Sequence, residues 1–141
     1  MEVQAHFENI QQSLLEELIS AESSIYAAIA WFTDWEIYQL LVEKARNNVA
    51  VNLLIQQDEI NLGQYGLDYR KLEAVGGTVS FVPPTAFNNI MHHKFCIIDS
   101  TTTVTGSYNW SKRARSNHEN IVVIKDESTA RQYEQEFRSI K

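Results

Sequence analysis

Two strand-length apolar segments separated by one amphipathic helix constrain the fold of this chain more than any other feature. Residues 25–32 and 49–55 are almost entirely apolar, which is typical of strands covered on both faces of a sheet. Between them, apolar residues recur at helical spacing to about residue 47, after a capping Thr33 or Asp34. A strand, a helix and a strand in this order predict a right-handed βαβ unit.

The remaining segments extend this unit into a layered α/β fold. Residues 3–21 carry apolar side chains at three- and four-residue spacing, which predicts an N-terminal amphipathic helix, and the polar residues 56–66 indicate a loop. The other predicted elements are helices over 68–75 and 128–140 (capped by Ser128), strands over 78–82, 94–98, 102–105 and 121–124, and a helical turn over 110–116. We therefore expect a single domain over residues 1–141, with a mixed, mostly parallel sheet flanked by helices.

The composition is that of a soluble domain with a real core. Of the 141 residues, 44% are hydrophobic and 21% are charged. No apolar run approaches the length of a membrane helix, and the N-terminus lacks the basic start and apolar stretch of a signal peptide. Cys96 is the only cysteine, which excludes a disulfide or a zinc knuckle within one chain. We expect a cytoplasmic protein without stable membrane association.

The charge of the chain is acidic overall but basic in one segment. The formal net charge of −6 disfavours broad, non-specific binding of nucleic acid. Between residues 92 and 115, however, the basic side chains outnumber a single acid, Asp99. These basic residues are Lys94, Lys112, Arg113 and Arg115. A local positive basin on an acidic body favours a compact phosphate site.

His92 and Lys94 begin the group of residues that carries the chemistry. Two residues apart on a strand, their side chains point to the same face and would flank one site. Histidine can act as nucleophile or proton donor near neutral pH, and lysine offers a positive charge to a phosphate oxygen. Taken alone, the pair has an alternative interpretation, in which His92 is a loop residue at a strand edge and Lys94 is a solvated charge.

The residues that follow favour the functional interpretation. Ser107 and Asn109 follow Gly106 and supply a turn, a hydroxyl and an amide, which are good partners for phosphate oxygens. Glu119 can accept a hydrogen bond from the second ring nitrogen of a histidine and so fix its tautomer. Together with His92, this set is suited to binding a phosphate and attacking its phosphorus.

The complete pattern resembles the signature of the phospholipase D superfamily. It consists of His92-x-Lys94-x4-Asp99, followed by residues 106–111 and by Glu119-Asn120. Residues 28–33 and 49–55 also resemble the first two strands of that family. The motif occurs once, as in the compact single-motif branch, which includes bacterial endonucleases of the Nuc type and mitochondrial phospholipase D-like nucleases.

The resemblance implies a role for each residue of the motif. His92 would be the nucleophile or, in the partner subunit, the general acid. Lys94 and Asn109 would bind the phosphate oxygens with help from Ser107, and Glu119 would orient His92.

Asp99 completes the catalytic motif, although the family uses it more as a structural hydrogen-bonding partner than as a proton carrier. Many nucleases neutralise the phosphate with a divalent cation, but here Lys94 and Asn109 would take that part, and no cluster of carboxylates surrounds the motif. We therefore expect no cofactor and no metal.

Several neighbouring residues are candidates for secondary roles. Lys112, Arg113 and Arg115 are candidate contacts to a nucleic-acid backbone, with a solvated surface as the alternative. Trp35, at a helix start, is a candidate for stacking on a base. For five further residues a structural role is the better interpretation, namely Trp31 and Cys96 in the core, Trp110 under the site, His93 on the opposite face of the strand and His118 in a loop.

The single motif also predicts the assembly. In-line displacement at phosphorus needs one group to attack and another to protonate the leaving oxygen from the opposite side, and one histidine cannot easily do both. A homodimer with two motifs around one cleft solves this problem. Our first hypothesis is a metal-independent endonuclease acting on nucleic acid through a phosphohistidine. The alternatives are a phospholipid-headgroup hydrolase and a non-catalytic phosphate- or nucleic-acid-binding module.

Overall fold

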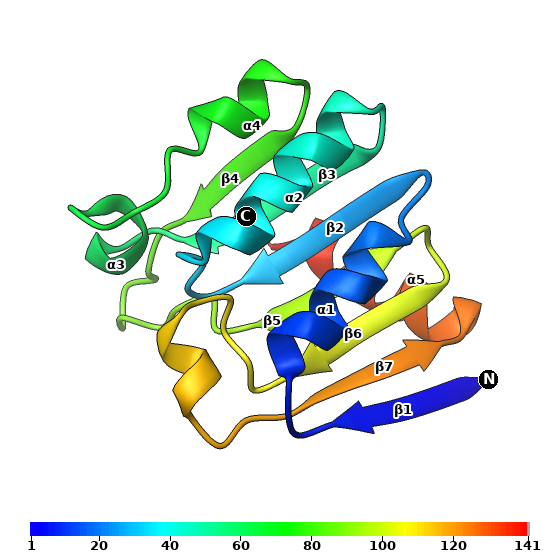
Figure 1. The fold of residues 1–141 in the computed structure, drawn as a ribbon. Coiled ribbons are helices and arrows are strands. Elements are labelled where there is room, and N and C mark those ends of the chain that lie inside the picture. Colours follow the sequence, from blue (N-terminus) through cyan, green and yellow to red (C-terminus); the bar gives the residue numbers. More distant parts are fainter. Residues whose placement is uncertain (141) are drawn as a thin grey trace.

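The two apolar segments form neighbouring interior strands, β2 and β3, of a seven-stranded sheet. A computed structural model describes residues 1–140, so the last residue of the expected domain, 141, lies outside the described part. The strand order is β1-β7-β6-β5-β2-β3-β4 (Figure 1). The strands are β1 (Glu2–His6), β2 (Ser24–Ile29), β3 (Ala50–Gln56), β4 (Thr78–Val82), β5 (Lys94–Ile98), β6 (Thr102–Gly106) and β7 (Ile121–Lys125). The helices are α1 (Ile10–Ile19), α2 (Trp35–Arg46), α3 (Glu59–Leu62), α4 (Arg70–Ala74) and α5 (Glu127–Ser139), with a 3-10 turn at Arg113–Ser116.

The predicted βαβ unit is present as β2, α2 and β3. The two strands are parallel, with Ile25 opposite Val51. Asp34 caps α2, since its carboxylate accepts hydrogen bonds from the backbone N–H groups of Glu36 at 3.0 Å and Ile37 at 3.2 Å. A capped helix that follows a buried strand thus turns the chain back to the next parallel strand.

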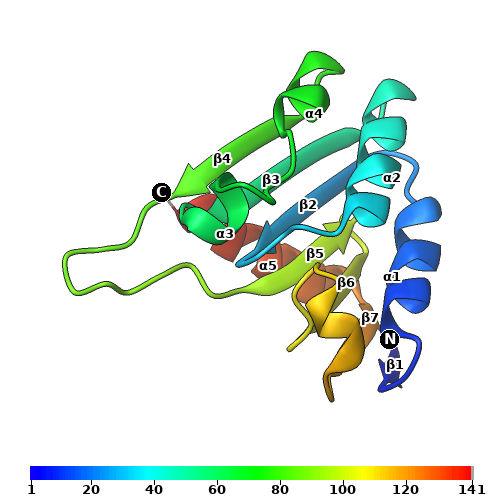
Figure 2. The same cartoon turned by 60° about the vertical axis from the view of Figure 1, so that its left-hand side comes forward.

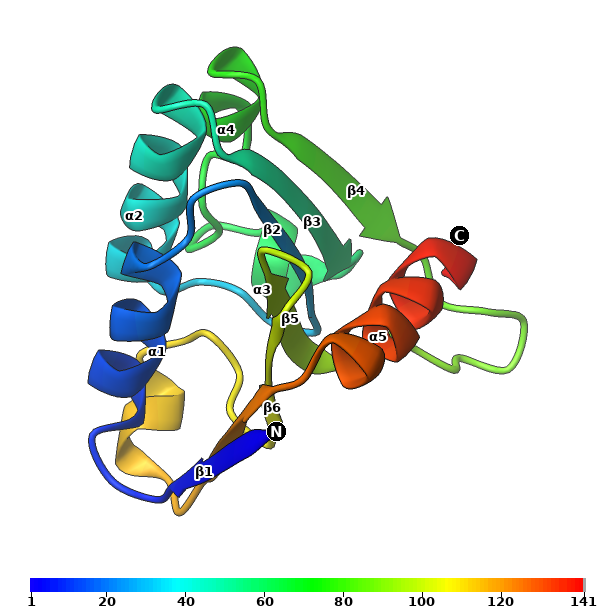
Figure 3. The same cartoon turned by 90° about the vertical axis from the view of Figure 1, so that its right-hand side faces the viewer.

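Helices cover both faces of the sheet. Side chains on a strand alternate between faces, so Ala27 and Cys96 pack toward α1 and α2, whereas Ala28 and Phe95 pack toward α5 (Figure 3). The segment between β4 and β5 projects beyond this three-layer body (Figure 2). It leads directly into His92.

The expectation of a mostly parallel sheet is wrong, because four of the six neighbouring strand pairs are antiparallel. The short connection between β5 and β6 accounts for one of these pairs. Asp99 and Ser100 have φ values of 54° and 56° in this connection, as a tight hairpin turn requires. A hairpin can join only antiparallel strands. The rest of the predicted class, a layered α/β fold with a mixed sheet, is confirmed.

The N-terminal helix predicted over residues 3–21 is also wrong in its first part. Residues 2–6 form the edge strand β1, with Val3 opposite Ile124 of β7. Val3 and Phe7 fit a helical spacing by coincidence, since both are exposed. Two smaller differences concern helix starts. Asp126 rather than Ser128 caps α5, and the predicted loop 56–66 contains the short helix α3, which Asp58 caps.

We predict a sharp difference in stability between two apolar truncations in this region. Leu14→Ala removes a fully buried side chain from α1 and should lower the free energy of unfolding by about 2–5 kcal/mol. Phe7→Ala removes a side chain that is 70% exposed and should cost about 0.5 kcal/mol or less. Urea unfolding followed by circular dichroism measures both. Equal losses would indicate that residues 3–21 form one helix with Phe7 on its buried face.

Candidate active site

One end of the β2–β5–β6 part of the sheet gathers the motif. Lys94 at the start of β5 lies opposite Ile29 at the end of β2, and the backbone N–H of Ala30 donates to the carbonyl of His93 at 2.7 Å. β6 ends at the same place, so that the residues after it face the start of β5. A surface depression of about 450 Å³ lies here. It is lined by His92, His93, Lys94, Thr105, Gly106, Ser107 and Asn109.

Lys94 holds His92 directly. Its Nζ lies 3.1 Å from both ring nitrogens of His92 and donates to the His92 carbonyl oxygen at 2.7 Å. Burial, the positive charge of Lys94 and the neighbouring His93 lower the pKa of His92. A histidine with a lowered pKa is neutral at pH 7 and has a lone pair for attack.

Trp31 forms a wall of the site that the sequence analysis did not foresee. Its ring meets the His92 ring edge to face at 5.3 Å between centroids, and Lys94 Nζ lies 5.7 Å from the Trp31 centroid. The indole Nε1 donates to Asp58 at 2.6 Å. Placing Trp31 in the core was therefore wrong. The available signal was its position just beyond β2, where side chains of a buried strand reach a surface.

Asn109 and Lys94 offer donors to the depression. Asn109 Oδ1 accepts a hydrogen bond from the backbone N–H of Trp31 at 3.3 Å, which leaves the amide Nδ2 able to donate. Burial lowers the pKa of Lys94, and the charge of Glu119 opposes this effect. An amide and an ammonium group in the same depression as His92 are suited to holding two phosphate oxygens.

Glu119 has partners other than the predicted one. Its Oε1 accepts a hydrogen bond from Ser107 Oγ at 2.5 Å, and its Oε2 accepts one from Asn117 at 3.1 Å. Ser107 Oγ also accepts from the backbone N–H of Asn120 at 3.1 Å. Within residues 1–140 no hydrogen bond joins Glu119 to His92. In a single chain, Glu119 therefore fixes Ser107 and acts on Lys94 through its charge.

Asp99 lies at the far end of β5 and takes no part in this site. Its carboxylate accepts hydrogen bonds from Ser23 and from the backbone N–H groups of Glu22 and Ser24, at 2.7–3.1 Å. Burial would raise the pKa of Asp99, but these backbone hydrogen bonds outweigh it, so the pKa is lowered. The structure thus separates Asp99 from His92 and Lys94, and a structural role, as in the family, fits this geometry.

The predicted nucleic-acid contacts divide into two groups. Arg115 is engaged in the fold, since its Nη2 contacts the buried Asp34 at 2.8 Å and Glu36 at 3.7 Å. Arg115, a candidate contact to a nucleic-acid backbone, therefore anchors Asp34, the residue that caps α2. Lys112, Arg113 and Trp35 are exposed, and the first and last of these line a second, larger pocket beside the site.

The residues expected to be structural mostly are. His93 borders the depression, but its ring contacts α5, where its Nε2 lies 2.9 Å from Glu136. Cys96 is fully buried, and burial raises its pKa to about 12. Trp110 is buried against Phe32. Among residues 1–140, no three His, Cys, Asp or Glu side chains come together as metal ligands would.

Comparisons with known proteins agree with this geometry. Residues 14–141 match the family described as "Cardiolipin synthase, PLD-like domain". The chain is 30% identical to a mitochondrial cardiolipin hydrolase of Danio rerio over 88% of this chain and 53% of that protein. It is 33% identical to a phospholipase D of Rickettsia typhi over 91% of this chain and 61% of that protein. The chain thus spans little more than half the length of such relatives.

Solved structures give the same result for the fold. The crystal structure of Nuc, a phospholipase D family member from Salmonella typhimurium, matches with a TM-score of 0.84 and 26% identity, covering 99% of this chain and 93% of that one. NucT from Helicobacter pylori also matches with a TM-score of 0.84, at 23% identity, covering 99% and 94%. Both share nearly the whole length of the described fold.

We predict that Asp99 stabilises the protein without acting in its chemistry. Asp99→Asn weakens charge-assisted hydrogen bonds to three backbone N–H groups and should lower the free energy of unfolding by about 2 kcal/mol at pH 7. Because its folded pKa is lowered, the stabilisation is present above the unfolded value of about 3.9 and is lost as the pH falls through the folded pKa.

Denaturant unfolding at pH 7 and pH 3 measures this difference. Asp68→Asn is the control, because Asp68 is paired only with the exposed Arg70 and should matter little at either pH. If Asp99→Asn is as stable as the wild-type protein but has lost turnover, the prediction is wrong and Asp99 has a catalytic role.

Proposed function

The chain belongs to the phospholipase D superfamily, and on this premise we propose that it is a metal-independent phosphodiesterase, with nucleic acid as the first candidate substrate. The observation that carries the proposal is the contact of Lys94 with His92 in a depression lined by Ser107 and Asn109. A nucleophile and its phosphate-binding groups are thereby held together before substrate arrives.

The proposed reaction has two displacements at phosphorus. A ring nitrogen of His92 attacks and forms an N–P bond, the P–O bond to the leaving group breaks, and the leaving oxygen takes a proton from a second imidazolium. That imidazole, now neutral, removes a proton from water, whose oxygen attacks phosphorus and releases His92. Lys94 and Asn109 stabilise the charge on the phosphate oxygens in both steps.

The second imidazolium is the reason to propose a homodimer. His93 and His118 do not line up behind the phosphate site, since His93 faces α5 and His118 is in an exposed loop. A two-fold dimer would bring a second His92 to the opposite side of the phosphorus. The depression is open and lies at an end of the sheet, which is compatible with such a contact.

A phospholipid headgroup is the second candidate substrate. The names of relatives, such as mitochondrial cardiolipin hydrolase, favour it, and so does the segment before His92, where Phe87 is 87% exposed and Ile90 is 41% exposed. Among residues 1–140, every helix is too short or too polar to cross a membrane. A lipid substrate would therefore be reached from a membrane surface through these side chains.

We predict that His92→Ala abolishes turnover while His93→Ala retains most of it. His92 is exposed and contributes little to the core, so the fold should persist in both variants. The assay uses labelled DNA, RNA and phospholipid vesicles in EDTA, and the wild-type protein should cleave a nucleic acid there. Label from the substrate phosphate should remain on wild-type protein after an alkaline quench and be released by acid.

Three results would contradict this proposal. Turnover that needs added magnesium would replace the histidine mechanism with metal chemistry. Turnover by His92→Ala would remove the nucleophile. Cleavage of phospholipid alone would make the second candidate substrate the right one.

We predict that activity follows the dimer. Because each chain supplies one His92, the specific activity should fall on dilution in parallel with the dimer fraction measured by light scattering and sedimentation. Leu62, which is 50% exposed and outside the depression, provides a labelled-cysteine reporter site, Leu62→Cys, for following dissociation at assay concentrations. An active monomer would show that one chain supplies both the nucleophile and the acid.

A further inference from the structure

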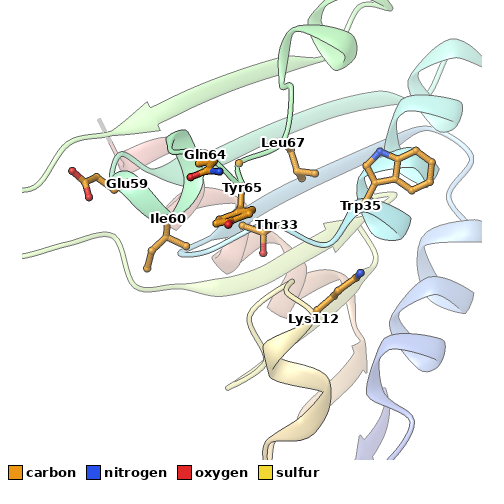
Figure 4. A pocket seen from close by; sticks show the side chains of 9 residues that line it. Thr33, Trp35, Glu59, Ile60, Gln64, Tyr65, Leu67 and Lys112 are labelled. Atoms are coloured by element: carbon orange, nitrogen blue, oxygen red, sulfur yellow. The ribbon is translucent and has the colours of Figure 1, made fainter.

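A pocket lies beside the candidate active site. It encloses about 800 Å³ between α2, α3 and the segment after Trp110. Figure 4 shows Tyr65 on the α3 side, Trp35 at the start of α2 and Lys112 reaching in from the third side. We propose that this pocket binds a nucleobase of the substrate strand next to the cleaved phosphate, an inference that rests on the proposed function.

The pocket and the site share the same short segments. Trp31 packs on His92, and Thr33 and Trp35, two and four residues later, line the pocket. Asn109 is at the site, and Lys112, three residues later, is in the pocket. A strand whose phosphate meets His92 would therefore reach the pocket within a short distance along its backbone.

Asp58 and Asn61 fix the pocket wall to the site. One oxygen of Asp58 accepts from Trp31 Nε1 at 2.6 Å, and the other accepts from the backbone N–H groups that begin α3. The fully buried Asn61 donates to the carbonyls of Ala30 and Gln56 and accepts from the N–H of Phe32. The wall formed by α3 is thus held by hydrogen bonds rather than by the pocket's own side chains.

The side chains in the pocket suit a base better than an acyl chain. Tyr65 is 85% exposed and Trp35 is 56% exposed, so their ring faces are available for stacking. Ile60 and Leu67 add apolar surface, while Gln64 offers an amide that can both donate and accept. Glu59 would be a poor neighbour for lipid tails.

Lys112 supplies the charge that a strand needs. It lines the pocket on the side of the Asn109 segment, where the backbone of a bound strand would pass. A cation at this position can pair with a phosphate next to the cleaved one. An aromatic wall with an adjacent cation is the combination that binds single-stranded nucleic acid with little sequence preference.

The test compares a substrate with bases and one without. Trp35→Ala and Tyr65→Ala are assayed on a single-stranded oligonucleotide and on bis(4-nitrophenyl) phosphate, with light scattering on each protein. We expect KM for the oligonucleotide to rise about tenfold for either variant, while kcat/KM for the small diester changes less than twofold. Phe7→Ala, an exposed aromatic far from the pocket in sequence, is the control and should change neither.

The other outcomes contradict the inference, and each of them points to a different explanation. An unchanged KM for the oligonucleotide would show that no base binds here, while the proposed function stands. Loss of the dimer in both variants would assign the pocket to contacts between subunits. A wild-type protein that cleaves neither substrate would overturn the proposed function itself.

Discussion

The antiparallel pairing of β2 with β5 is the constraint on which the site depends. It places the end of one buried strand beside the start of another, so that Trp31 and His92 emerge at the same edge of the sheet. The hairpin into β6 then returns Ser107 and Asn109 to that edge. Residues scattered between positions 31 and 119 thus meet because β2 ends, β5 begins and β6 ends at the same edge of the sheet.

The same hairpin explains why the motif contains an acid that lies away from the site. Asp99 begins the turn after β5 and holds the chain that enters β2 through backbone hydrogen bonds. The turn and the entry into β2 lie at the opposite end of the sheet from His92. Asp99 therefore stabilises the pairing of β2 and β5 at one end of the strands, and this pairing positions His92 and Lys94 at the other end.

The electrostatics of the site differ from those of the whole chain. The protein carries a formal charge of −6, yet partial burial and the positive charge of Lys94 lower the pKa of His92. Glu119 is close enough to oppose the lowered pKa of Lys94 and is occupied by Ser107 and Asn117. The electrostatics of the site thus depend on the placement of a few groups, not on composition.

The sequence by itself determined the βαβ unit, the layered class and most of the site, because continuous apolar strands and a tightly spaced motif are local signals. It did not determine strand direction, since apolar runs look alike in parallel and antiparallel strands. For β5 and β6 the direction is set by the hairpin turn, which has positive φ angles at Asp99 and Ser100. Tertiary structure alone placed Trp31 on His92 and Arg115 on Asp34. Such contacts join residues 61 to 81 positions apart, and no local pattern encodes which surface a side chain will meet.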